Sequence, residues 1–428
     1  MYHFKLARHT DPREAGKCLL RELRSWADEC INRYADEDPL DTPDQAIYAT
    51  GWMPLMYFEP AYPGLRFLHQ LRDKTAKHFQ SSDAWRHGYW RMADVTRGMA
   101  HFEIFLAQLA RLDDDVATIG QLLDAAEHLG NWSDQVDPWF DAAHGVFPSH
   151  TFGAEGFQKD QSPAFNTPEL FHCISLALSA YRTNRSDRYA KWALAYGGRW
   201  ADAILAGNKL PVGLDAKGPV YEPAIANDPR ENLHRAEALL SAGAVESLLK
   251  LSNISGEQYY RQAAEAIIDA LLPELMDPDA GALAAAIRFY RRITKSDRYD
   301  QAVLSELAHL IPTGVEVVDL DMAPIFDDDI LGIGKYSDQP HWKEDGQMRQ
   351  HNPIFIGLAA EITNDPALAA CALDYGTAYL SLAQRAFPDG REDSASARTV
   401  SAVARGHARD NGAGIVTEVL VPLMARFK

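Results

Sequence analysis

The stretch Ser186-Asp187-Arg188-Tyr189-Ala190-Lys191-Trp192-Ala193 lies between two apolar segments with helical spacing, and it decides the predicted fold. Its first residues suit a tight turn and a helix N-cap, and its tyrosine falls in the first turn of the helix that follows. The signal returns as Gly256-Glu257-Gln258-Tyr259 and Ser296-Asp297-Arg298-Tyr299, and more weakly as Asn364-Asp365-Pro366-Ala367. A repeated helix-turn-helix unit cannot bury its apolar face alone, so we expect the copies to stack on one another.

Periodic apolar residues predict helices on both sides of these turns. The predicted segments cover residues 11–34, 63–79, 88–112, 116–129, 166–181, 187–205, 232–251, 257–272, 279–292, 297–311, 351–362, 365–386 and 411–427. With the apolar stretch 43–58 they amount to about fourteen helices, joined alternately by short and long connections. Strand signal is weak, and residues 315–320 are its best candidate.

The alternation of short and long joins predicts an all-α fold, an (α/α) toroid of about six or seven hairpins. One domain would occupy residues 1–428, with the helix over 11–34 packing beside the helix over 411–427 to close the ring. An open solenoid is the alternative. In the ring all inner helices run the same way, so the long loops collect at one mouth, where function is expected.

Composition limits the function classes. The chain has 428 residues and a net charge of −18, which argues against a general nucleic-acid binder. No apolar run reaches the length of a membrane span, so no membrane partner is expected. The four cysteines show neither metal nor disulfide spacing, and we predict no metal and no cofactor. The start of the chain has no leader pattern, which favours a cytoplasmic location, or a periplasmic one if a leader has been removed.

The long loops, and the first turns after them, are rich in aromatic, histidine and arginine side chains. Flat rings stack on sugar rings, and Arg or Asn binds hydroxyls and carboxylates, so this mouth suits a sugar chain. The set comprises Trp132, Trp139, His144, His150, Glu155, Asn166, Tyr221, Glu222, Arg230, His234, Lys335, Tyr336, His341, Trp342, Arg349, His351, Asn352, Arg405, His407, Arg409, Asp410 and Asn411.

With its repeated Ser-Asp-Arg-Tyr and Gly-Glu-Gln-Tyr turns and its aromatic, His-rich loops, the chain resembles the (α/α)-toroid carbohydrate-active enzymes. It looks most like the single-domain (α/α)-barrel polysaccharide lyases that act on uronate polymers of the glucuronan or alginate type. The resemblance covers the chain from about residue 43 onward. It implies β-elimination on an anionic oligo- or polysaccharide by a monomer or homodimer.

In such lyases Asn, His or Arg neutralises the substrate carboxylate, and Tyr or His moves the protons. The resemblance therefore implies Asn166 at the carboxylate, His234 in neutralisation or base work, and Tyr221 as base and acid. His407 and Arg409 would complete the catalytic set, with Tyr336 in reserve for Tyr221. The predicted substrate-binding residues are Arg97, His101, Trp139, His150, Glu222, Tyr336, Trp342, Arg349 and His351.

Other readings of the same residues stay open. A glycoside hydrolase would need two carboxylates, for which Glu155, Glu222 and Asp410 are the candidates. A sugar epimerase or a non-catalytic binding repeat would use the same scaffold. His101 and Glu103 are two residues apart on a predicted helix and cannot share a face, so one of them is expected to be structural.

Overall fold

The computed structural model describes residues 9–39, 44–81, 85–86, 89–90, 93–153, 155–158, 165–222, 230–275, 281–310, 353–386 and 415–427. Helices dominate these residues and the strands are short, which confirms the all-α class at this level. Internal contacts divide the chain into two compact units. Unit 1 is Met1–Phe67 with Leu272–Lys428, and unit 2 is Leu68–Leu271.

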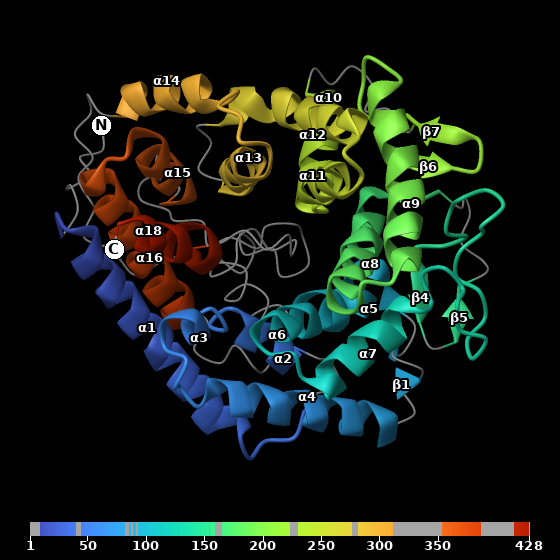
Figure 1. The fold of residues 1–428 in the computed structure, drawn as a ribbon, viewed down its shortest axis with the longest axis horizontal. Helices are drawn as coiled ribbons and strands as arrows, with labels where there is room; N and C mark the ends of the chain where they lie inside the picture. Colours follow the sequence, from blue (N-terminus) through green and yellow to red (C-terminus); the bar gives the residue numbers. More distant parts are fainter. Residues whose placement is uncertain are drawn as a thin grey trace. The chain divides into compact units, whose positions relative to one another are not determined.

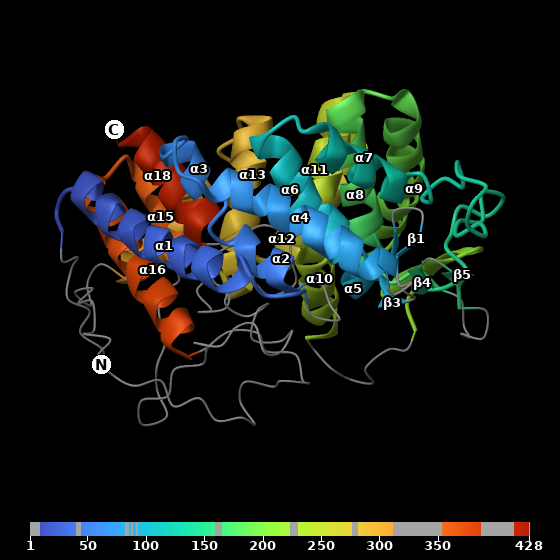
Figure 2. The same cartoon turned by 90° about the horizontal axis from the view of Figure 1, so that it is seen from below.

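Unit 1 holds both ends of the chain. Its helices are α1 Pro12–Tyr34, α2 Asp44–Thr50, α3 Leu55–Phe58, the short η3 Leu272–Glu274, α13 Gly281–Thr294, α14 Asp300–Leu310, α15 Pro353–Thr363, α16 Pro366–Ala386, the π-helical η5 Ile415–Leu420 and α18 Val421–Arg426. Helices α15 and α16 form a hairpin, and α1 packs along α16 (Figure 2). Helix α18 contacts α1 and α15, and α13 also packs on α15. Helix α4, Gly64–Ser81, runs from the end of unit 1 into unit 2.

The sequence of helix α1 contains three features that favour a helix: an N-cap, a proline in the first turn and a periodic apolar face. Asp11 caps it by accepting a hydrogen bond from the backbone N–H of Arg13, and Pro12 occupies the first helical position, where no N–H is needed. Leu19, Leu23 and Trp26 recur every three or four residues and are buried, so one face of the helix forms part of the core.

Unit 2 contains successive helical hairpins and small sheets. The elements are β1 Trp85–Arg86, β2 Tyr89–Trp90, β3 Ala93–Asp94, α5 Val95–Ala100, the π-helical η1 His101–Leu106, α6 Ala107–Leu112, α7 Val116–Ala126, β4 Thr151–Gly153, β5 Gly156–Phe157, η2 Pro168–Leu170, α8 Phe171–Asn184, α9 Asp187–Leu205, β6 Gly213–Asp215, β7 Gly218–Val220, α10 Glu231–Ser241, α11 Ala244–Ser255 and α12 Gln258–Leu271. The hairpins are α6–α7, α8–α9 and α11–α12, and α9 packs on α12 while α8 packs on both η1 and α11 (Figure 1).

The longer joins of unit 2 carry its strands. Strands β3, β4 and β5 form an antiparallel sheet, in which Phe152 pairs with Ala93 on one side and Phe157 on the other. Strands β6 and β7 form a hairpin in the join between α9 and α10. Within the described residues, no helix is both long enough and apolar enough to cross a lipid bilayer.

Four of the short joins share one backbone feature, which the α6–α7 join lacks because Asp113, directly after α6, is extended. The residue directly after the first helix of a hairpin has a positive φ at Arg185 (57°), Gly256 (76°), Lys295 (58°) and Asn364 (58°). A left-handed residue at this position is a common way to end a helix, because it turns the next N–H back to a free carbonyl. Each of the repeated turn signals therefore starts one residue before its Ser, Glu or Asp.

This shared residue also fixes which tyrosines correspond. Four residues after it come Tyr189, Tyr260 and Tyr299, all of them buried, so the counterpart in the second copy is Tyr260 and not Tyr259. Tyr189 donates a hydrogen bond from its hydroxyl to Glu127, at the end of α7, and Tyr260 donates to the carbonyl oxygen of Leu194 on α9 at 2.8 Å. In both cases the hydroxyl reaches back to the second helix of the preceding hairpin.

A pair of glycines on α9 permits its close contact with the next hairpin. A Cβ atom added to Gly197 would clash with Cδ1 of Leu251 on α11. One added to Gly198 would lie 3.0 Å from the hydroxyl of Tyr259 on α12. The absence of side chains here lets the backbone of α9 approach both helices.

Most helix bounds agree with the sequence predictions, and α9 matches the predicted 187–205 at both ends. Two differences have physical causes. The predicted helix over 88–112 begins only at Val95, because Ala93 and Asp94 pair with β4. The predicted helix over 232–251 is divided into α10 and α11 at Gly243, where φ is 75°. The strand candidate 315–320 lies outside the described residues.

Candidate functional site

Part of the predicted site lies beyond what the structure describes. Outside the described residues are Tyr336, Trp342, Arg349, His351, His407, Arg409 and Asp410. Arg97 lies on α5, and its side chain is not among those described.

Asn166 is fully buried inside unit 2. Its Oδ1 accepts hydrogen bonds from the backbone N–H of Phe147 at 2.9 Å and from the hydroxyl of Tyr196 at 2.9 Å, and its Nδ2 donates to the carbonyl oxygen of Phe147 at 2.7 Å. Its backbone pairs with Leu214 of β6. The amide thus joins two long loops to α9, and this fully buried, architectural position does not suit the expected contact with a substrate carboxylate.

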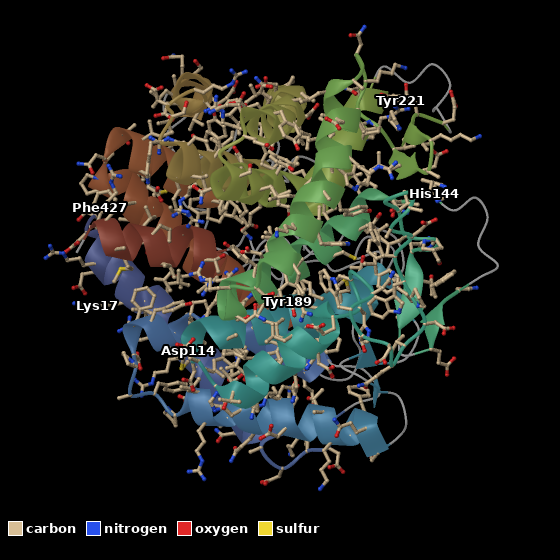
Figure 3. All side chains as sticks on the ribbon, turned by 45° about the vertical axis from the view of Figure 1, so that its right-hand side comes forward. Lys17, Asp114, His144, Tyr189, Tyr221 and Phe427 are labelled. Carbon is tan, nitrogen blue, oxygen red and sulfur yellow. The ribbon has the colours of Figure 1, made fainter. Side chains whose placement is uncertain are left out.

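Tyr221 and His234, the predicted proton-transfer residues, have different surroundings in the structure. The carbonyl oxygen of Tyr221 accepts a hydrogen bond from Nη2 of Arg235 at 2.7 Å, which ties the end of the β6–β7 hairpin to α10. His234 points to solvent, with its side chain 44% exposed, and pairs with Glu237 at 3.0 Å. Figure 3 shows Tyr221 beside the β6–β7 hairpin. Glu222, the next residue, is exposed.

Arg235 and Glu231, which the sequence analysis did not single out, hold this loop. Arg235 is buried, and its Nη1 donates to the carbonyl oxygen of Leu210 at 2.8 Å. The Glu231 carboxylate bridges Arg235 and Lys209, whose Nζ lies 2.7 Å away. A buried guanidinium is stable only when its donors are satisfied in this way, so the cluster anchors the loop to the start of α10.

Two predicted substrate-binding residues are core residues. Trp139 is buried with its ring 4.7 Å from that of Phe152 and 4.9 Å from that of His128. His101 is 1% exposed and packs against the rings of Phe102 and Phe105. Burial lowers the pKa of His101 to about 3, so its ring is neutral at physiological pH.

Besides His234 and Glu222, His150 and Glu155 are exposed members of the predicted set, and they lie near the strands β4 and β5. His150 accepts a backbone hydrogen bond from Val95 at 2.9 Å, through its carbonyl oxygen. His144, from the wider mouth set, is exposed and pairs with Asp141 at 2.6 Å (Figure 3). These side chains belong to the loop surface of unit 2.

Among the histidine–carboxylate pairs in the described residues of unit 2, the most deeply buried joins Glu103 and His172. Glu103 lies on η1 and His172 in the first turn of α8, and Nδ1 of the histidine is 3.3 Å from Oε2 of the glutamate. Their side chains are only 10% and 7% exposed. Two different hairpins therefore bring a carboxylate and an imidazole together in a largely dry environment, where their interaction is strengthened.

The surroundings keep the carboxylate ionised. Burial alone would raise the pKa of Glu103, but the hydrogen bond and charge of His172, a hydrogen bond from Ser175 and the charge of Lys250 together lower this pKa below its ordinary value. Ser175 is on α8 and Lys250 is on α11, where it also pairs with Glu246 at 3.0 Å. The group thus draws on the first helices of three consecutive hairpins.

The π-helical turn η1 directs the side chains of His101 and Glu103, which are two residues apart in the sequence, to different surroundings. In η1, His101 enters the aromatic core while Glu103 meets α8, which fits the expectation that they do not share a face. A π-helical segment inserts an extra residue into a helix, and such segments occur often at functional sites. The insertion here lies within the continuous run α5, η1 and α6.

This pair has a defined chemical capacity. With its Nδ1 proton donated to Glu103, His172 is held in one tautomer and orientation, and Nε2 is the atom that takes up or returns a proton. Sequence reasoning missed His172, because single polar residues in an apolar helix are usually structural. The one available signal was its place in the apolar run Phe171-His172-Cys173-Ile174, at the start of a predicted first helix.

No family model matches this chain, and no curated protein or solved structure matches it either. The chemistry of its own residues therefore carries the functional hypothesis.

Proposed function

We propose that this protein is a polysaccharide lyase that cleaves a uronic-acid-containing glycan by β-elimination. His172 is the proton-transfer group and Glu103 is the carboxylate that orients it. The observation that carries the proposal is the buried Glu103–His172 pair, with a separation of 3.3 Å between Nδ1 and Oε2. In this proposal the pair takes the proton-transfer role that the sequence analysis assigned to His234 and Tyr221.

The proposed architecture is an (α/α) toroid. Support comes from the helix pairs inside each unit, four of which are joined by a short turn that begins with a residue in the left-handed conformation. In unit 2, the second helix α9 packs on the second helix α12, and the first helix α8 packs on its neighbours η1 and α11. Repeated hairpins packed in this way curve progressively, and a ring places their first helices around a common axis.

The proposed reaction matches the groups around the pair. His172 Nε2 takes the C5 proton of the uronate, the C4–C5 double bond forms, and the bond from C4 to the leaving oxygen breaks. The leaving oxygen then takes up a proton, so the product carries one new unsaturated end. We assign Lys250 to the substrate carboxylate, because its positive charge already acts on Glu103. Neutralising that carboxylate makes the C5 proton acidic enough to remove.

The test is a panel of uronate polymers, with the ultraviolet absorbance of the unsaturated product as the readout. We expect activity on at least one polymer, a loss of about 100-fold or more in His172→Gln, and a smaller loss in Glu103→Gln, because the first removes the base and the second only its orientation. His144→Gln is the control, since this exposed histidine lies on the loop surface. Near-normal turnover of a folded His172→Gln variant would refute the role of the pair.

Three other outcomes decide against the lyase. New reducing ends without the chromophore indicate a hydrolase, and the carboxylates Glu155 and Glu222 are then the first to replace. A change of sugar configuration without any change in chain length indicates an epimerase. Binding of a polymer without any product indicates a non-catalytic repeat. His234→Ala, compared with His172→Gln, separates the sequence-based assignment from the pair.

A further inference from the structure

A second cluster of reactive groups lies in unit 1, between the start of α1 and α16. Asp374 on α16 accepts two hydrogen bonds from His9: its Oδ1 lies 2.7 Å from the ring Nδ1, and its Oδ2 lies 3.0 Å from the backbone nitrogen. The other ring nitrogen, Nε2, lies 3.7 Å from Sγ of Cys18 on α1. A carboxylate, an imidazole and a thiol thus follow one another in hydrogen-bonding order.

The order of these groups is that of a nucleophile, its base and the group that orients the base. Asp374 is held in place by burial, with 5% of its side chain exposed, while His9 is 31% exposed. Because the carboxylate accepts hydrogen bonds from both the ring and the backbone of His9, it favours the tautomer in which Nδ1 carries the proton. Nε2 then faces the sulfur as an acceptor.

A positive charge completes the cluster. Nη2 of Arg21, one turn further along α1, lies 2.9 Å from Sγ of Cys18. A guanidinium and an imidazole beside a sulfur both stabilise negative charge on it, which is the usual environment of a reactive cysteine. Lys17, the residue before Cys18, is labelled in Figure 3 and marks this part of α1.

The other cysteines of the chain have the opposite environment. Cys30, Cys173 and Cys371 are buried, whereas Cys18 is partly exposed. Burial raises the pKa of the Cys30 thiol to about 12 and also raises the pKa of Cys173. Apolar surroundings keep such thiols protonated and inert, so they serve as internal references for Cys18.

We propose that Cys18 is a nucleophilic cysteine that hydroperoxides convert to a sulfenic acid, with His9 as the base and Asp374 as the positioning residue. The thiol proton passes to Nε2 of His9 and the sulfur attacks one peroxide oxygen. The S–O bond forms as the O–O bond breaks, so the sulfur loses two electrons and the peroxide gains them. The proton held by His9 goes to the leaving oxygen, which departs as water when the oxidant is hydrogen peroxide.

A hydroperoxide is the reactant class that this geometry suits. It is small and uncharged, so it reaches a half-buried sulfur on a helix surface without a preformed pocket. The guanidinium of Arg21 lies where it can stabilise the charge that develops on the sulfur and the departing oxygen. The inference is independent of the proposed lyase activity, because no residue is shared between the two clusters.

The experiment treats the full-length protein with hydrogen peroxide, traps sulfenic acid with dimedone and measures labelling at each cysteine by mass spectrometry. We expect Cys18 to label about tenfold faster than a free cysteine derivative in the same solution, and the three buried cysteines to label slowly. His9→Gln and Arg21→Gln should each reduce the Cys18 rate several-fold. Glu14→Gln is the matched control, because Glu14 is exposed on the same helix and pairs with Lys17.

Several results decide the proposal. Labelling of Cys18 no faster than the free thiol overturns it, as does an unchanged rate in His9→Gln. Because Asp374 is nearly buried, Asp374→Asn can also weaken the fold, so the more exposed His9 and Arg21 variants carry the test and circular dichroism confirms that each is folded. A rate lowered equally in Glu14→Gln would show a general effect of surface charge and would also contradict the role of the cluster.

Discussion

The hydroxyl of Tyr196 donates a hydrogen bond to Oδ1 of Asn166 at 2.9 Å, and both side chains are buried. Burial raises the pKa of Tyr196 well above its ordinary value, so the phenol stays protonated and remains a donor. The same amide binds both backbone groups of Phe147. Asn166 is thus the point at which α9 and two long loops of unit 2 are fastened together.

Replacing Asn166 by Ala should therefore destabilise the protein. The change leaves the N–H and C=O of Phe147 and the Tyr196 hydroxyl buried without their partner, and we expect a loss of about 2–4 kcal/mol in the free energy of unfolding. Tyr196→Phe, which removes one of these bonds, should cost about 1 kcal/mol. Urea unfolding measures both. An Asn166→Ala variant as stable as the wild type would return this residue to the list of catalytic candidates.

The buried His101 should make stability depend on pH. Its pKa is lowered to about 3 by burial, from an unfolded value of 6.5, so below pH 6.5 the unfolded chain binds a proton that the folded protein does not. Stability is therefore lost as pH falls, by about 2 kcal/mol between pH 7 and pH 5 from this group alone. The variant His101→Leu has no such group and should lose less stability over the same interval. Equal pH dependence in both proteins would contradict this account.

The glycines of unit 2 give a matched pair of substitutions. Gly197→Ala places a methyl group against Cδ1 of Leu251, closer than van der Waals contact, and we expect a loss of about 1–3 kcal/mol in stability through overpacking. Gly120→Ala, on the exposed side of α7, meets nothing within 4 Å and should stabilise the helix by about 0.5–1 kcal/mol. Thermal unfolding of the two variants should give shifts of opposite sign. A Gly197→Ala variant as stable as the wild type would show that α9 and α11 do not pack as described, whatever the result for Gly120→Ala.

Two left-handed residues in the short joins allow substitutions that should change stability in opposite directions. Gly256 has a φ of 76°, so Gly256→Ala should cost about 1 kcal/mol, because a Cβ disfavours this backbone conformation. Lys295 already carries that strain at a φ of 58°, and Lys295→Gly should stabilise the turn by up to about 1 kcal/mol. Chemical denaturation measures both. A destabilising Lys295→Gly would show that its side chain contributes more than the turn geometry costs.

The sequence predicted the hairpins well because they are encoded locally. Cap, periodicity and turn residues lie within about twenty positions of one another, and α9 was predicted to the residue. The sequence pattern aligned Tyr259 with Tyr189 and Tyr299, whereas the structure shows that Tyr260 is their counterpart. The left-handed residue that sets this alignment is Arg185 in one copy, Gly256 in another and Lys295 in a third, so no single residue type marks it.

The candidate site was harder to predict because it depends on contacts between distant segments. Asn166 and Trp139 resemble rim residues in sequence, yet Phe147 and Phe152 from the same long join cover them. Conversely, Glu103 and His172 are separated by 69 residues and meet only when η1 packs on α8. Polar residue types in loops indicate which chemistry is available, but packing decides which of them remain accessible.

The tyrosine hydroxyls described above have a consequence for the order of assembly. Tyr189 binds Glu127, and Tyr260 binds Leu194, so the hairpins α8–α9 and α11–α12 are each hydrogen-bonded to the hairpin that precedes them in the chain. During translation the partner of each tyrosine has already left the ribosome when the tyrosine emerges. Unit 2 can therefore assemble in the direction of synthesis, with every completed hairpin serving as the template on which the next one docks.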